Sequence, residues 1–170
     1  MLFERYLMPD RMTDHYYHVT PDLLTQMGIR ALICDIDNTL ATYEQPDPPK
    51  DLIRWCTEMR QAGIQIAFVS NNTEERVSRF NKPFGFPAYP DSGKPSPAKL
   101  RLAMEQMGTD VTSTAMLGDQ LLTDALAAKL CGLFVIIVPP IADKKNLFFR
   151  CKRWLEKPYV REYKRRHLLL

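Results

Sequence analysis

Short apolar runs alternate along this chain with segments in which apolar residues recur every three or four positions. The runs are near-continuous and bounded by turn residues, as in strands buried on both faces, and they cover residues 29–34, 64–70, 87–89, 113–117 and 133–138. Helical spacing, N-capping residues and C-terminal glycines predict helices over residues 21–27, 50–62, 73–80, 97–107 and 120–130. This alternation predicts an α/β fold in which helices cover both faces of a parallel sheet.

Composition is that of an ordinary globular protein. A chain of 170 residues with 45% hydrophobic and 25% charged residues fits one domain, residues 1–170, with a core of its own. The four cysteines show neither a CxxC pair nor a zinc spacing, and the N-terminus lacks a signal-peptide pattern. We therefore expect a cytoplasmic protein with reduced thiols. The most apolar stretch, residues 133–138, is far too short to span a bilayer.

Polar residues follow the predicted strands at the point where each strand ends. Asp35 and Asp37 come after the first, Ser70 and Asn71 after the second, and Asp119 after residues 113–117. In a parallel sheet these ends meet at one edge, where ligands bind, so we expect a shared crevice. Residues two apart on a strand point the same way, and like charges at close range disfavour joint ionisation. The aspartate pair therefore indicates a metal site, an acid/base pair, or both.

Four motifs, in chain order, resemble those of the haloacid dehalogenase (HAD) phosphohydrolase superfamily. They are D-x-D-x-T-L at 35–40, a strand-ending serine at 70, a lysine before a helix at 94, and G-D-x-x-x-x-D at 118–124. The stretches LMPD, DIDNTL, SNN and GKPSP are similar to the YqeG-like branch of subclass IIIA, to which the phosphatidylglycerophosphate phosphatases of mitochondria are related. The resemblance implies a Rossmann-like three-layer HAD core.

The resemblance also implies roles for the acidic residues. Asp35 resembles the nucleophile that forms an aspartyl-phosphate, and Asp37 resembles the general acid and base. The carboxylates of Asp35 and Asp119, with the backbone carbonyl of Asp37, would hold Mg²⁺, a hard cation suited to oxygen ligands. Asp124 would support that metal shell, although the residues alone also allow it to be a carboxylate on a helix surface.

The remaining motif residues are implied in binding the phosphoryl group. Ser70 and Lys94 would contact its oxygens, and Thr39 would order the motif loop. Ser70 has the alternative of capping the following turn, and Asn71 either contacts phosphate or holds that turn. Lys99 competes with Lys94, but the neighbours of Lys94, a glycine and a proline, place it in a loop like the family's.

The chain leaves no room for the cap domain that many HAD enzymes insert beside the active site. It passes directly from Leu40 to the helix that contains Leu52, and only a short segment joins Ser70 to Lys94. We therefore expect a capless enzyme with an open site. Such a site favours large substrates or completion by an oligomeric neighbour, and the sequence does not indicate an oligomeric state.

The C-terminal segment 144–170 is basic and aromatic. It contains ten Lys and Arg residues against two Glu, whereas the rest of the chain is net acidic. Apolar residues share one face of a helix predicted over 146–155, which either lies on an anionic membrane surface or packs on the sheet. The cluster Lys164-Arg165-Arg166 binds lipid headgroups, binds RNA phosphates or is disordered. No nucleic-acid-binding motif accompanies it.

The predicted function is that of a Mg²⁺-dependent phosphomonoester hydrolase, with phosphatidylglycerophosphate as the best single substrate and peripheral membrane contact through the tail. One alternative keeps the chemistry but acts on a phosphoprotein or on the phosphate end of a nucleic acid. Another is a non-catalytic, RNA- or ribosome-associated module. Multiple turnover on any phosphomonoester separates the enzymes from the module.

Overall fold

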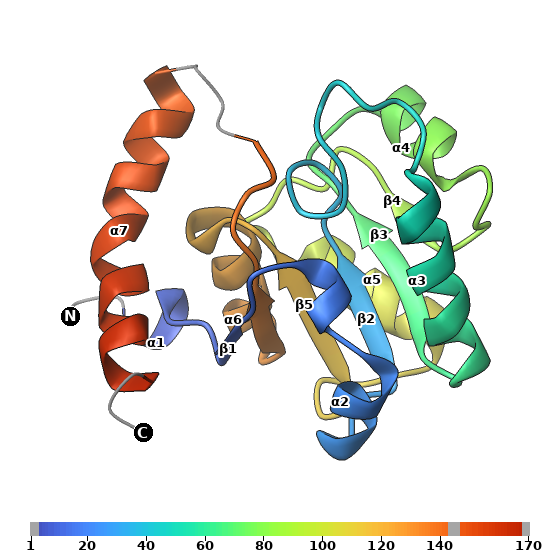
Figure 1. The fold of residues 1–170 in the computed structure, drawn as a ribbon, viewed down its shortest axis with the longest axis horizontal. Helices are drawn as coiled ribbons and strands as arrows, with labels where there is room; N and C mark the ends of the chain where they lie inside the picture. The colour runs from blue at the N-terminus through green and yellow to red at the C-terminus, as the bar shows by residue number, and fades with distance from the viewer. Residues whose placement is uncertain (1–3, 143–146, 168–170) are drawn as a thin grey trace.

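The computed structural model describes residues 4–142 and 147–167. The side chains of residues 147–150, 152 and 153 lie outside this description, as do residues 144–146 and 168–170 of the basic segment. Figure 1 shows a central sheet with helices on both faces and a long C-terminal helix beside one edge.

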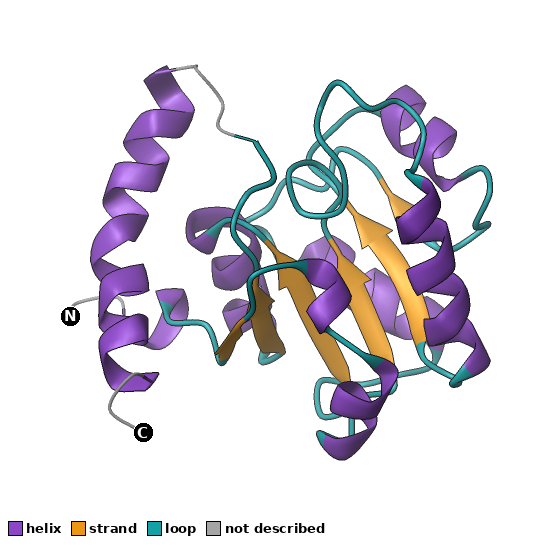
Figure 2. Cartoon of the chain, in the orientation of Figure 1, coloured by secondary structure: helices purple, strands orange, loops and turns teal. Residues whose placement is uncertain are grey.

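Six parallel strands form the sheet, in the order β1-β6-β5-β2-β3-β4 (Figures 1 and 2). Their bounds are β1 (Arg11–Met12), β2 (Ala31–Cys34), β3 (Gln65–Val69), β4 (Ala88–Tyr89), β5 (Thr114–Gly118) and β6 (Phe134–Ile137). The register aligns Cys34 of β2 with Phe68 of β3 and Leu117 of β5, so these three strands end at one level. Because the strand order reverses between β2 and β5, a crevice is expected outside their carboxyl ends.

Two helical layers enclose two cores. One face carries the 3₁₀ turn η1 (Tyr16–His18) and helices α2 (Pro21–Gln26), α3 (Lys50–Gln61) and α4 (Glu74–Asn81). The other carries α1 (Glu4–Leu7), α5 (Ala98–Met107), the π-helical turn η2 (Leu121–Ala125) and α6 (Leu126–Cys131). Successive strand residues point to opposite faces: Leu32 and Cys34 enter the first core, Ala31 and Ile33 the second. The predicted three-layer α/β architecture is confirmed.

Several elements differ from the sequence-based expectation, and α1 and η1 were not predicted at all. Strand β1 was not predicted, because its two residues are too few to show any periodicity. The backbone N–H groups of Asp10 and Thr13 donate to Val135 O and Ile137 O, and the Asp10 carboxylate accepts from Val135 N, so β1 is held along β6. The helix expected over 120–130 begins instead with the π-helical turn η2, a geometry often found at functional sites.

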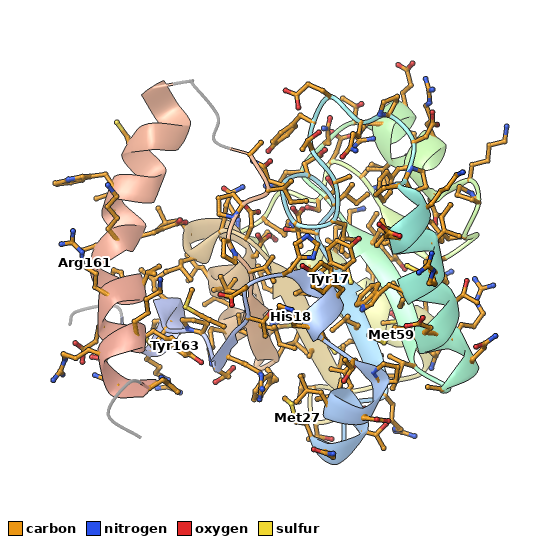
Figure 3. All side chains as sticks on the ribbon, viewed as in Figure 1. Tyr17, His18, Met27, Met59, Arg161 and Tyr163 are labelled. Carbon is orange, nitrogen blue, oxygen red and sulfur yellow. The ribbon has the colours of Figure 1, made fainter. Side chains whose placement is uncertain are left out.

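Helix α7 (Leu147–His167) extends well beyond the helix predicted over 146–155 and includes Pro158. Tyr163 lies on the side that faces α1 and β1, and Arg161 points away (Figure 3). The Tyr163 hydroxyl accepts a 3.0 Å hydrogen bond from Met12 N. A buried carboxylate on the same helix, that of Glu156, accepts from the backbone N–H of Leu122 in η2 at 3.1 Å. Helix α7 is thereby attached to the element that follows β5.

The apolar face predicted for the tail does not pack on the sheet where it is described. Cys151 is exposed, and Trp154 and Leu155 are 69% and 51% exposed. The other two members of that face, Leu147 and Phe148, have side chains outside the described residues. Across the described ranges, no helix is both long and apolar enough to cross a membrane.

Candidate active site

The predicted site residues come together at the carboxyl ends of β2, β3 and β5. Six of them line one cleft of about 400 Å³, and Thr39 and Asp119 lie against the acidic residues in it. The lining consists of Asp35, Asp37, Tyr43, Ser70, Asn71, Asn72, Lys94, Gln120, Thr123 and Asp124. The crevice expected at the switch point of the sheet is therefore present.

A cluster of buried carboxylates forms the floor of this site. Asp35, Asp119 and Asp124 each place an oxygen within 4.8 Å of the others. The hydroxyl of Thr39 lies 3.3 Å from Asp35 Oδ2 and 3.2 Å from Asp119 Oδ1, so its single proton is shared between these two carboxylates. Thr39 thus connects the acidic residue that follows β2 with the one that follows β5.

Lys94 bridges two of these carboxylates. Its Nζ lies 2.7 Å from Asp35 Oδ1 and 2.7 Å from Asp124 Oδ1, and it donates to Val69 O at 2.7 Å. Burial disfavours the ammonium, but Asp124 and Asp35 outweigh burial and hold the pKa of Lys94 above its ordinary value. Lys94 is therefore cationic. The competing Lys99 lies elsewhere, with its Nζ 6.0 Å from the Tyr89 ring.

The charge balance of the cluster fits a divalent cation. Burial raises the pKa of Asp35 to about 8, and Asp124 and Asp119 add to the rise while Lys94 opposes it. Ionisation of Asp35 in this cluster therefore needs more positive charge than the Lys94 ammonium supplies. Carboxylate oxygens are the ligands that hard cations such as Mg²⁺ prefer.

The turn between Asp35 and Ala41 is fixed by its own backbone. Asn38 N donates to Ala41 O at 2.7 Å, and Leu40 N and Ala41 N donate to Ile36 O. Asn38 has a φ of 68°, in the left-handed region that asparagine tolerates better than most residues. This turn places the Asp37 carboxylate in the lining of the same cleft as Asp35.

Asn71 holds the loop that carries Lys94. Its Oδ1 accepts from Ser92 Oγ at 2.7 Å and from Lys94 N at 2.8 Å, and its Nδ2 donates to Lys94 O at 3.1 Å. Ser70 is buried, and its Oγ accepts from Asn72 N at 3.1 Å, which leaves the hydroxyl proton to donate elsewhere. Both residues line the cleft, where a phosphoryl group would bind. Their contacts with that group stay predictions.

Asp124 ties the loop after β5 to the turn η2. Its Oδ2 accepts from Asp119 N at 3.2 Å and Gln120 N at 3.0 Å. This approach is close because Gly118 precedes the loop: a Cβ at Gly118 would lie 2.5 Å from the Asp124 Cβ. The glycine and the second aspartate of G-D-x-x-x-x-D therefore depend on each other sterically.

Several residues in the cleft or in contact with its lining were not predicted from the sequence. Arg76 of α4 forms an ion pair with Asp37, at 3.1 Å between Nη2 and Oδ1. Tyr43 comes from the proline-rich loop 41–49, and burial and the nearby aspartates raise its pKa. Thr123 and Gln120 come from η2 and the residue before it. None of them has a spacing that distinguishes it from an ordinary loop or helix residue.

The cleft has no cap between residues 41 and 94, all of which are described. Residues 41–49 form a loop that contains neither helix nor strand apart from a bridge at Ala41, and the segment 70–94 contains α4 and β4, which belong to the core fold. The expected open site is confirmed for this part of the chain.

An open parallel α/β sheet with a buried acidic crevice at its switch point is the architecture of a large class of enzymes. A model of the haloacid dehalogenase-like hydrolases matches residues 43–132, which begin just after Asp35 and Asp37. The Bacillus subtilis (strain 168) protein described as "Probable phosphatase YqeG" is 32% identical over 165 residues, 97% of this chain and 96% of that protein. The chain therefore belongs to the haloacid dehalogenase-like hydrolases and is a HAD-type phosphatase.

Solved structures share the fold at low identity. The cobalt-bound deoxy-D-mannose-octulosonate 8-phosphate phosphatase from Haemophilus influenzae superposes with a TM-score of 0.54 at 17% identity, over 81% of this chain and 90% of that one. A subfamily IIIA HAD hydrolase from Legionella pneumophila gives 0.51 at 23% identity, over 69% and 71%. These likenesses show the fold, and the YqeG relationship agrees with the branch that the motifs predict.

Proposed function

We propose that this chain is a Mg²⁺-dependent phosphomonoester hydrolase that works through an aspartyl-phosphate on Asp35. One observation carries the proposal: the Asp35 carboxylate is held at the end of β2 between Lys94 and Thr39, within a buried acidic cluster and in the same cleft as Asp37. A nucleophile, a cation for the phosphoryl oxygens and a second carboxylate for proton transfer are the groups that this reaction needs.

Asp35, Asp119 and the backbone carbonyl of Asp37 are the groups that would hold the metal, with Asp124 supporting them. When bound, Mg²⁺ neutralises charge on the phosphoryl group and on the attacking carboxylate. The proximity of Asp35, Asp119 and Asp124, and the raised pKa of Asp35 among them, support this assignment.

In the first step, a carboxylate oxygen of Asp35 bonds to phosphorus as the bond from phosphorus to the leaving oxygen breaks. Asp37 transfers its proton to that leaving oxygen, so the product departs as a neutral alcohol. The Lys94 ammonium and the Ser70 hydroxyl stabilise the phosphoryl oxygens during the transfer. Asn71 contributes by holding the Lys94 loop, and its remaining amide proton is available to a phosphoryl oxygen.

In the second step, Asp37 is a carboxylate and accepts a proton from water. The water oxygen bonds to phosphorus as the bond between phosphorus and Asp35 breaks, which releases inorganic phosphate and regenerates both aspartates. Thr39 holds the Asp35 and Asp119 carboxylates in a fixed relative position through both steps.

For the substrate we propose phosphatidylglycerophosphate, met at a membrane surface by a cytoplasmic enzyme. The YqeG-like motifs support the lipid, and the absence of a cap between residues 41 and 94 supports a bulky substrate. Trp154 and Leu155 are exposed on α7, together with Lys157 and Arg161. Exposed aromatic and aliphatic side chains among cations are typical of a helix that contacts an anionic membrane surface.

The test is Mg²⁺-dependent phosphate release from an aryl phosphate and from phosphatidylglycerophosphate in mixed micelles, with wild type against Asp35→Asn. Release from both substrates, lost in the variant, supports the full proposal. Aryl phosphate turnover alone retains the chemistry and removes the lipid. Absence of turnover on both, and on phosphoproteins and phosphorylated nucleic-acid ends, would leave the non-catalytic module.

A further inference from the structure

Arg76 is the most extensively bonded charged side chain at the cleft that the mechanism above does not use. It is the third residue of α4, and its side chain is only 11% exposed. Nε and Nη2 donate to Asp37 Oδ1 at 3.3 and 3.1 Å. Nη2 also donates to Thr42 O at 3.2 Å, and Nη1 donates to Pro46 O at 3.0 Å. The guanidinium lies 5.0 Å from the Phe80 ring.

The second oxygen of Asp37 is held from the same segment. Asn72 Nδ2 donates to Asp37 Oδ2 at 2.8 Å, and Thr73 N donates to Asn72 Oδ1 at 2.8 Å, which fixes the orientation of the amide. Both carboxylate oxygens of Asp37 therefore meet donors that come from the chain just after β3. Its orientation is set by that segment as well as by its own turn.

Electrostatics explains why such a clamp is needed. Asp37 shares the cleft lining with Asp35 and Asp124, and like charges at close range repel. Without a counter-charge, this repulsion would favour side-chain conformations in which the Asp37 carboxylate points away from the cluster. Arg76 supplies that counter-charge in a planar fork that fixes direction as well as distance.

Arg76 also fixes the wall of the cleft beside Asp37. Its bonds to Thr42 O and Pro46 O hold the two ends of the short loop that contains Tyr43. Tyr43 lines the cleft, in a chain whose residues 41–94 contain no cap. One guanidinium therefore places both the proton-transfer carboxylate and the loop next to it.

We propose that Arg76 is a positioning residue that aims Asp37 at the leaving oxygen of the substrate. This inference rests on the proposed function, and it adds a residue that determines which leaving groups the enzyme accepts. A good leaving group, such as 4-nitrophenolate, departs with little help from an acid. Phenolate and alkoxides need the proton, so a misplaced Asp37 penalises them selectively.

The experiment measures kcat/KM for a series of aryl phosphates, from 2,4-dinitrophenyl through 4-nitrophenyl to phenyl phosphate, and for an alkyl phosphate. Arg76→Gln is compared with wild type, and Arg76→Lys tests charge without the fork. The matched control is Arg79→Gln: Arg79 lies on the same helix and pairs with Asp47 of the neighbouring loop, but it does not contact Asp37.

In Arg76→Gln we expect the slope of log kcat/KM against leaving-group pKa to steepen. The loss on phenyl and alkyl phosphates should exceed the loss on 2,4-dinitrophenyl phosphate by on the order of 10- to 100-fold. This is less than the roughly 10²- to 10⁴-fold contribution of a positioned general acid, because Asp37 itself is still present. Arg76→Lys should fall between, and Arg79→Gln should keep the wild-type slope. In an Asp37→Asn background, Arg76→Gln should not change the slope further.

Two results would overturn the inference: an equal loss on all substrates, which indicates a structural role, or a shallower slope, which indicates that Arg76 holds Asp37 away from the substrate. A second measurement does not depend on turnover. Thermal unfolding of Arg76→Gln, Asp37→Asn and the double variant should be non-additive, and additive shifts would exclude the ion pair. If wild type hydrolyses no phosphomonoester, the proposed function fails, and this cycle still decides whether Arg76 holds Asp37.

Discussion

The raised pKa of Asp35 makes a prediction about stability in the absence of metal. An unfolded chain releases the Asp35 proton near the ordinary pKa of about 3.9, whereas the folded protein keeps it to about 8. Between these two values the folded state binds more protons than the unfolded state, so its stability must fall as the pH rises. This is the opposite of the usual aspartate, whose native interactions lower the pKa.

The magnitude follows from the same two values. One pKa unit corresponds to about 1.4 kcal/mol, so between pH 5 and pH 7 this carboxyl lowers the free energy of unfolding by roughly 2 to 3 kcal/mol. For a chain of 170 residues that is a fall in Tm of roughly 5 to 10 °C. An ionised Asp35 is costly because it is buried beside Asp124 and Asp119, and Lys94 offsets only part of that cost.

The assay is thermal unfolding in EDTA from pH 4.5 to pH 8.5, with wild type against Asp35→Asn. The amide cannot ionise, so the variant should lose the descending part of the curve and be the more stable protein at pH 7. Asp22→Asn removes an exposed carboxylate on α2 and is the control that should run parallel to wild type. Adding Mg²⁺ should stabilise wild type more at pH 8 than at pH 5, because the cation binds the ionised form.

Parallel curves for wild type and Asp35→Asn in EDTA would refute the reasoning. They would mean that Asp35 ionises at an ordinary pH, and therefore that Lys94 compensates the whole cluster. An equal Mg²⁺ effect at pH 5 and pH 8 would contradict the assignment of the cation to these carboxylates.

Three further substitutions test other parts of the structure. Asn71→Ala removes three hydrogen bonds that hold the Lys94 loop, so kcat/KM should fall by roughly 10- to 100-fold. In a Lys94→Ala background the further fall should be smaller, because only a direct contact of the amide with phosphate is then left to lose. Gly118→Ala places a Cβ 2.5 Å from the Asp124 Cβ and should lower the free energy of unfolding by about 1–3 kcal/mol in urea titrations. Glu156→Ala removes the buried carboxylate that joins α7 to η2 and should cost about 1–3 kcal/mol, whereas an alanine at an exposed position of α7 should change little.

The sequence predicted the elements that a local pattern of residues determines. Strands β2, β3, β5 and β6 are buried on both faces and therefore appear as apolar runs, and α4 begins at the predicted cap, where Thr73 Oγ1 accepts from Arg76 N. Strand β1 could not be seen this way, because two residues paired along an edge carry no periodic signal. An α-helix was predicted where η2 lies, because α-helices and π-helices bury residues at similar spacings.

The acidic residues of the site were predictable for a related reason. Burying a carboxylate is unfavourable unless the charge is paired or binds a metal. Asp35, Asp37 and Asp119 therefore stand out in the sequence against the apolar runs before them. Arg76 gives no such contrast, since an arginine in the first turns of an amphipathic helix is normally solvated. Only the folding of α4 against the loop 42–46 brings its guanidinium to Asp37.

Two parts of the structure supply different groups to the cleft. Strands β2 and β5 are adjacent and fully buried, and they carry the proposed nucleophile and the carboxylates that would hold the metal. The donors to Asp37 come instead from the chain after β3, and one of them, Arg76, is held in turn by backbone carbonyls of the surface loop 42–46. A surface loop tolerates substitution far better than a buried strand pair. If Arg76 aims Asp37 as proposed, we expect changes in residues 42–46 to alter the preference for leaving groups while the surroundings of Asp35 stay the same.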